Sequence, residues 1–134
     1  MKGLLNFIFS SMAVEGVITT ATINLNTAAD GRHPSVITAF TLPDEHPEWP
    51  EGTIMVQAMD NTTPIPGEAT ALTSSATSNI IGVLNRRVAT NETSGNVLIH
   101  GSCPAEILKY VPSTGPVDAT AAQIAALRVA GVYV

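Results

Sequence analysis

The sequence is poor in cysteine, in aromatic residues and in charge. Cys103 is the only cysteine among the 134 residues, so the chain forms no intrachain disulfide and holds no zinc site of the usual multi-cysteine kind. Aromatic residues make up 4% and charged residues 13% of the chain, whereas roughly 25% charge is usual in soluble domains. We therefore expect folding in the cytoplasm, a core of small aliphatic side chains, and a surface that tolerates contact with other protein.

Basic residues are also scarce. The chain has 6 Lys plus Arg against 11 Asp plus Glu, for a net charge of −5. A nucleic-acid surface needs clustered positive charge, and Arg86-Arg87 is the only adjacent basic pair. The sequence also contains neither a P-loop nor a G-x-G-x-x-G motif, so it predicts neither nucleic-acid nor nucleotide binding.

The apolar run near the N-terminus is too short for a membrane span. It starts at Leu4, is interrupted by Asn6, and falls far short of the roughly twenty residues that cross a bilayer. It imitates a secretory signal but has no clear A-x-A cleavage site. We expect an arm whose partner is protein rather than lipid, with these apolar contacts: Leu4, Leu5, Phe7, Ile8 and Phe9.

Two segments before residue 42 have the pattern of strands. In residues 16–26, one face at a period of two holds Val17, Ala21, Ile23 and Leu25, and the other holds Thr20, Thr22, Asn24 and Asn26. This pattern is typical of a half-buried strand. Residues 35–41 are rich in β-branched side chains and predict a second strand. The two segments are compatible with a hairpin that has a long loop.

Residues 42–52 are dense in proline and acid. Three prolines exclude a helix or a central strand there, and we place a boundary near residue 50, with an arm at 1–50 and a compact body at 51–134. Trp49, between two prolines, predicts either a cap on a local core or an anchor for a partner. The acidic side chains match no calcium loop, so a solvated loop is the default.

The body is predicted to be mainly β with one late helix. Residues 53–59, 80–84 and 96–101 read as strands, and residues 60–67 as a turn and loop. Thr120 and Gln123 have the spacing of a capping box. The short alanine-rich helix that follows needs a docking surface to be stable.

A catalytic site has little support in this sequence. His100, Ser102 and Cys103 are close in sequence, but residues so near each other on a strand seldom face one another, and no nucleophile elbow accompanies them. We prefer a strand-end histidine and a small buried cysteine. The prediction is a structural or binding protein without enzyme activity, cofactor or metal.

Three segments carry a resemblance to a known family: the strand-like residues 52–56, the apolar residues 80–84 and the ending at 121–134. With them, residues 53–134 resemble the head decoration proteins of tailed bacteriophages, typified by the lambda decoration protein. A short helix, a glycine and a final apolar strand close that family's domain in the same manner.

The resemblance implies a β-clip domain with a minor helix. It further implies a homotrimer on the outer surface of a virion, made in the host cytoplasm, that clamps major capsid subunits without enzyme activity. In the lambda-like member the N-terminal arm adds a strand to the capsid protein. The arm here is longer, and the resemblance makes its residues capsid contacts: Leu4, Leu5, Phe7, Ile8, Phe9, Val17, Thr19, Ala21 and Ile23.

Three alternatives remain open at this point. The arm residues from Leu4 to Phe9 can instead fold back on their own body. A secreted or surface adhesion module would use the same small-residue β surface to bind a glycan or a receptor. A small hydrolase would centre on His100 and Cys103.

Overall fold

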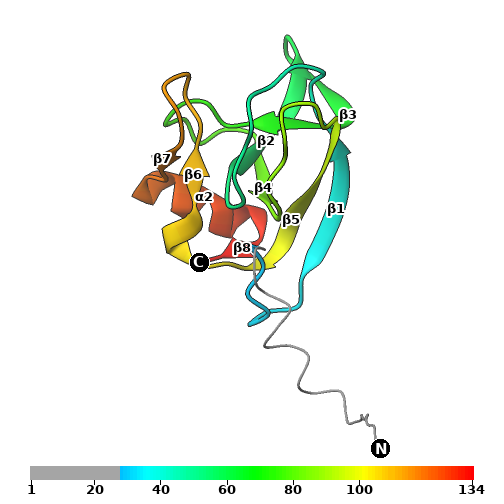
Figure 1. Cartoon of the computed structure of the whole chain (residues 1–134). Helices are drawn as coiled ribbons and strands as arrows, with labels where there is room; N and C mark the ends of the chain where they lie inside the picture. The colour runs from blue at the N-terminus through cyan, green and yellow to red at the C-terminus, as the bar shows by residue number, and fades with distance from the viewer. Residues whose placement is uncertain (1–27) are drawn as a thin grey trace, which may run out of the picture.

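The strands pair in the order β1-β3-β2-β4-β5-β8, and a further pairing of β1 with β5 closes the first five into a ring (Figure 1). The computed structural model describes residues 28–134. A two-stranded sheet of β6 and β7 lies beside the ring. The predicted class, mainly β with one helix, is confirmed. The elements are β1 (Val36–Thr41), β2 (Ile54–Asp60), β3 (Thr63–Ala71), β4 (Ile80–Leu84), β5 (Ser94–Ser102), a 3₁₀ turn (Ala105–Ile107), β6 (Lys109–Tyr110), β7 (Val117–Asp118), α2 (Ala121–Ala130) and β8 (Val132–Tyr133).

The central strands are buried on both faces. In β2, Ile54 and Met55 are both fully buried, but they belong to two different core clusters. Neighbouring residues of β4 and β5 are also buried in different clusters. Val83 and Leu98 belong to the cluster of Ile54, and Leu84 and Val97 belong to the cluster of Met55. Successive side chains of a strand point to opposite faces, so these strands read as continuous apolar runs rather than as alternating ones.

Helix α2 forms where its capping signals predict. The Thr120 side chain accepts a hydrogen bond from the Gln123 backbone, and the Gln123 side chain accepts one from the Thr120 backbone. The helix ends at Gly131, whose φ of 116° is left-handed and favours glycine. Leu127 is fully buried in the core cluster that also contains Val132 of β8. The helix therefore docks on the sheet, as its short length requires.

The prediction of a turn and loop over residues 60–67 is wrong. Only Asn61 and Thr62 lie between β2 and β3, because β3 already begins at Thr63. The prolines at 64 and 66 made this segment read as a loop. They are accommodated because this part of β3 pairs with β2 alone; β1 meets β3 only through Thr41 and Glu68, and an edge strand tolerates proline.

The described part of the predicted arm lies within the body. Strand β1 pairs with β5 from Val36 to Thr41, and Ala28, Ala29 and Leu42 are buried in the two core clusters. The packing thus continues across residue 50, because the proline-rich loop stays hydrogen-bonded to the sheet. Residues 1–27, with the strand predicted at 16–26, lie outside the described residues.

Candidate functional site

The proline-rich loop is held by backbone hydrogen bonds to distant residues. Leu42 donates its N–H to the Thr93 carbonyl at 2.8 Å, and Gly52 donates to the Leu84 carbonyl at 2.9 Å. Between them, Trp49 and Val88 exchange N–H···O bonds of 3.0 and 2.9 Å. These bonds fix the loop although its prolines allow it no regular structure.

Trp49 caps a core. Its side chain is 4% exposed and lies in the cluster with Met55 and Leu84. The His46 ring stacks on the indole with centroids 4.2 Å apart. Of the two roles considered for Trp49, this geometry favours the cap on a local core, since only a small part of the ring is open to a partner.

His46 ties the loop to the segment before β5. Its Nδ1 lies 2.7 Å from the Pro47 carbonyl oxygen, and its Nε2 lies 2.7 Å from that of Glu92. A neutral imidazole carries one N–H and donates one of these bonds, whereas the imidazolium ion donates both. The ring is thus a fixed part of the loop's anchorage.

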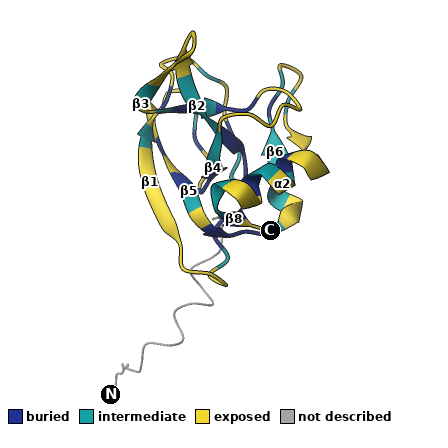
Figure 2. Ribbon diagram, turned by 180° about the vertical axis from the view of Figure 1, so that it is seen from behind, coloured by how far each residue is buried: buried dark blue, intermediate teal, exposed yellow. Residues whose placement is uncertain are grey.

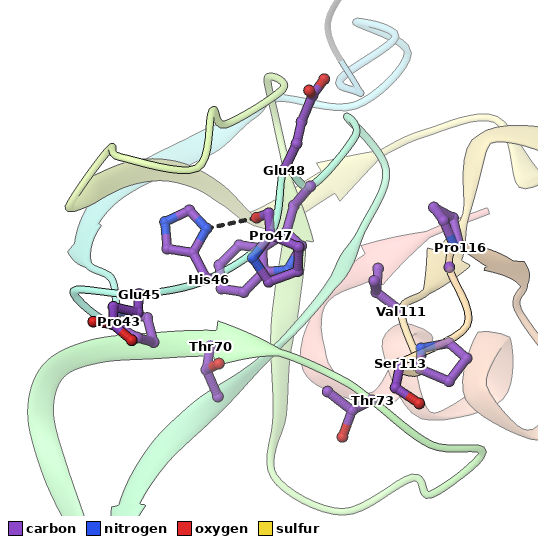
Figure 3. A pocket seen from close by; sticks show the side chains of 13 residues that line it. Pro43, Glu45, His46, Pro47, Glu48, Thr70, Thr73, Val111, Ser113 and Pro116 are labelled. Atoms are coloured by element: carbon purple, nitrogen blue, oxygen red, sulfur yellow. Dashed lines mark hydrogen bonds between the residues drawn. The ribbon is translucent and has the colours of Figure 1, made fainter.

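A pocket of about 660 Å³ lies beside the stacked rings (Figure 3). Prolines from two separate loops make up much of its wall, Glu45 contributes a carboxylate, and Thr70 and Thr73 contribute hydroxyls. Such a surface is mixed in polarity, as ligand pockets usually are. The lining residues are Pro43, Glu45, His46, Pro47, Glu48, Trp49, Thr70, Thr73, Val111, Pro112, Ser113, Gly115 and Pro116.

The acids of the loop do not assemble a cation site. The Glu48 carboxylate pairs with Arg87 at 2.6 Å, and both side chains are more than half exposed. Within residues 28–134, no group of three His, Cys, Asp or Glu side chains is arranged to hold a metal ion. The same range contains no helix that is long and apolar enough to cross a membrane.

The Ser102 side chain belongs to a partly exposed polar cluster, whereas Cys103 lies in an apolar core cluster. The Ser102 hydroxyl donates to the Asp30 carboxylate, which also accepts from the Arg32 backbone at 3.0 Å and pairs with the Arg32 guanidinium at 3.1 Å. Burial of Asp30 raises the pKa of its carboxyl, but these hydrogen bonds and the charge of Arg32 outweigh burial and lower that pKa overall.

The Cys103 thiol is a poor nucleophile. It is fully buried, and burial, together with the nearby charge of Asp30, raises its pKa to about 12. Since the thiolate is the reactive form, this position suits a structural cysteine. His100 is exposed, and its ring meets that of Tyr133 edge to face with centroids 6.0 Å apart.

Strand β1 carries apolar side chains that are open to solvent. Val36 is 47% and Ile37 is 43% exposed, and the strand is open along nearly its whole length (Figure 2). Tyr133 is also exposed, beside His33 and His100. Within residues 28–134, these residues make β1 and β8 an apolar surface that a partner can reach.

Sequence reasoning located Trp49 and the capped helix, but it missed the buried polar residues. Gln123 is fully buried, and its amide donates to the carbonyls of Ser74 and Ala76 at 2.9 and 3.2 Å. Asn85 is buried and accepts from the Ala29 backbone. Their partners are distant in the chain, so no local pattern reveals them. The predicted arm contacts Leu4, Leu5, Phe7, Ile8, Phe9, Val17, Thr19, Ala21 and Ile23 lie outside the described residues.

No protein-family model matches the chain, and no curated protein matches it closely enough to count as a relative.

Proposed function

We propose that the chain is a virion structural protein that decorates the outer surface of a tailed-bacteriophage capsid and stabilises it by clamping neighbouring major capsid subunits. The observation that carries this proposal is the C-terminal closure, in which α2 ends at Gly131 and β8 pairs with β5. The resemblance of the sequence to the decoration proteins implies this ending.

The N-terminal arm supplies the capsid contacts in this proposal. Burial of Phe7, Ile8 and Phe9 contributes on the order of several kcal/mol, at about 1.5–3 kcal/mol for each large side chain before ordering costs. The alternating residues Val17, Thr19, Ala21 and Ile23 provide main-chain groups for strand addition. The low charge of the chain, 13%, lowers the desolvation cost of such contacts.

A homotrimer follows from the weakness of a single arm. Three arms on one particle gain avidity, because the second and third bind at an effective concentration on the order of millimolar. Sedimentation equilibrium of the pure protein tests this step. We expect a mass three times that of the 13.9 kDa chain, and a monomer would contradict it.

The decisive test is decoration of shells. Purified full-length protein is mixed with expanded heads assembled from the major capsid protein of the same phage, and bound protein is measured after the heads are pelleted. We expect saturable binding to the outer surface, and a delay in disruption of the heads by heat. Bare heads at saturating protein would contradict the proposal.

A matched pair of variants tests the role of the arm. The triple change Phe7→Ser, Ile8→Ser and Phe9→Ser removes the apolar side chains at constant length, and we expect loss of binding with the oligomer intact. The control, Ser10→Ala and Ser11→Ala in the same arm, should bind as the unaltered protein does. Equal binding by the two variants would remove the arm from the mechanism.

A further inference from the structure

The pocket beside His46 lies between two loops that are distant in the chain. One wall belongs to the proline-rich loop, and the other belongs to the turn between β6 and β7, residues 111–116. In Figure 3, Glu45 stands on one side of the pocket and Pro116 on the other. Its volume of about 660 Å³ falls within the roughly 300–1,000 Å³ of known ligand pockets. A ligand of that size therefore contacts both walls at once.

Both walls are tied by hydrogen bonds within the chain itself. The bonds of the proline-rich loop to the sheet are given above. In the second wall, Gly115 donates its N–H to the Pro112 carbonyl at 3.0 Å, and Val111 donates to the Leu72 carbonyl at 2.8 Å. A preformed pocket loses little conformational freedom when a ligand binds. Proline rings, which fix φ, stand at four positions of the walls: Pro43, Pro47, Pro112 and Pro116.

Glu45 is a carboxylate of the pocket that lacks an opposite charge. The neighbouring Glu48 pairs with Arg87 at 2.6 Å, and Figure 3 shows its side chain directed away from Thr70. Within residues 28–134, Glu45 forms no ion pair, and no Lys or Arg lines the pocket. The whole chain also has a net charge of −5. The pocket is therefore suited to a cationic group.

The two rings of the pocket leave few polar atoms for a ligand. Both nitrogens of His46 lie 2.7 Å from carbonyl oxygens, those of Pro47 and Glu92. Trp49 is 4% exposed beneath the His46 ring, so its face cannot stack on a ligand. The rings therefore supply apolar surface rather than hydrogen bonds.

Three hydroxyls supply the remaining polar contacts. They belong to Thr70 on β3, to Thr73 just after it and to Ser113 in the opposite wall. In the part of the chain that the structure describes, none of these hydroxyls bonds to another residue. A hydroxyl donates and accepts, and an extended peptide has unpaired N–H and C=O groups to offer. The combination of hydroxyls and one carboxylate thus matches a peptide that carries a positive charge.

We propose that this pocket binds an extended peptide segment of a partner protein through an arginine side chain. The guanidinium pairs with Glu45, the apolar stem lies against the proline rings, and the peptide main chain bonds to the hydroxyls. Arginine is favoured over lysine, because a guanidinium is more weakly hydrated and can bind a carboxylate through two hydrogen bonds. The site is separate from the N-terminal arm, and its test needs no capsid, so either proposal can fail without the other.

A random peptide library tests the proposal with the full-length chain. Immobilised protein selects from hexapeptides that are randomised at every position, and the bound sequences are compared with the starting library. We expect arginine to be enriched roughly fivefold or more at one position, and lysine less. Enrichment of aromatic or acidic residues in place of arginine, or of no residue at all, would overturn the proposal.

The most enriched hexapeptide, labelled with fluorescein, is then the probe for affinity. Fluorescence polarisation compares Glu45→Gln with the unaltered protein, and we expect roughly tenfold weaker binding because a charge-assisted pair is lost. The matched control, Glu106→Gln, makes the same change in net charge at an exposed residue outside the pocket. It should bind within about twofold of the unaltered protein. Equal losses in the two variants would mean that the acidic chain attracts the peptide without a defined site, and would overturn the proposal.

Replacing the arginine of the probe by citrulline, its uncharged analogue, completes a double-mutant cycle. We expect the citrulline peptide to bind the unaltered protein roughly tenfold more weakly than the arginine peptide does. It should lose little further affinity on Glu45→Gln, because the pair is already broken. Losses that simply add would show that the guanidinium and Glu45 do not contact each other, and would overturn the assignment of Glu45 as the partner of the arginine.

Discussion

The proline-rich loop from Leu42 to Gly52 and helix α2 differ in how far along the chain their partners lie. The loop bonds to Leu84, Val88 and Thr93, all more than thirty residues away. The helix is capped by Thr120 and Gly131 at its own ends. The loop therefore forms only when the sheet forms, whereas the ends of the helix are specified by residues next to it.

This contrast predicts a different response to substitution. Changes in the loop should lower the free energy of unfolding through the packing of the whole sheet. Changes at the helix ends should remove only the free energy of the local capping contacts. The expected effects fall from several kcal/mol in the loop to a small pH-dependent difference at Asp30.

Trp49→Ala should have the largest effect. The ring is 4% exposed and packs in the cluster with Met55 and Leu84, so its loss should lower the free energy of unfolding by about 3–5 kcal/mol. Chemical denaturation followed by circular dichroism measures it. Trp49→Phe, which keeps a ring over the core, is the control and should lose less. A loss below about 1 kcal/mol for Trp49→Ala would show that the loop is not coupled to the sheet.

Leu127→Ala should destabilise by about 2–5 kcal/mol, because Leu127 is fully buried where α2 meets the sheet. Val129 lies on the same helix but is 90% exposed, so Val129→Ala should change stability by no more than about 0.5 kcal/mol. Thermal unfolding of the two variants side by side measures the difference. Similar shifts for both would mean that α2 is not docked through Leu127.

Thr120→Ala should cost about 1 kcal/mol, since it removes the side chain that accepts the Gln123 N–H. Gln123→Ala should cost more, because its amide also donates to Ser74 and Ala76. A double-mutant cycle separates the shared part, and we expect a coupling of about 0.5 kcal/mol or more. Strict additivity would be evidence against a reciprocal capping box.

The sequence was informative where the determinants are local. The capping box at Thr120, the glycine at 131 and the β-branched run at 36–41 each predicted the element that forms. The prolines at 64 and 66 misled because their tolerance depends on β3 being an edge there, which is a property of the assembled sheet. The burial of Gln123 and the Asp30 cluster were likewise beyond prediction, since their partners lie 47 to 72 residues away.

The smallest expected effect is the pH dependence contributed by Asp30. Its pKa is lowered from the ordinary value of 3.8, so the charged form is favoured in the folded state. The stability this provides is complete above the unfolded pKa and is lost as the pH falls through the folded pKa. Asp30→Asn removes the charge. It keeps one acceptor oxygen, for the Ser102 hydroxyl and the Arg32 backbone N–H, but puts an amide donor where the carboxylate accepts from the Arg32 guanidinium.

We therefore expect the unaltered protein to be more stable than Asp30→Asn at about pH 6, and the difference to shrink as the pH falls below the ordinary value of 3.8 and through the lowered folded pKa. Urea denaturation at a series of pH values measures it. Ser102→Ala should reduce the same difference, because the Ser102 hydroxyl is one of the groups that lower the pKa. A difference that grows on acidification would mean that burial, and not hydrogen bonding, dominates the pKa of Asp30. The contact between the start of the body and the end of β5 would then form without the charge of the carboxylate.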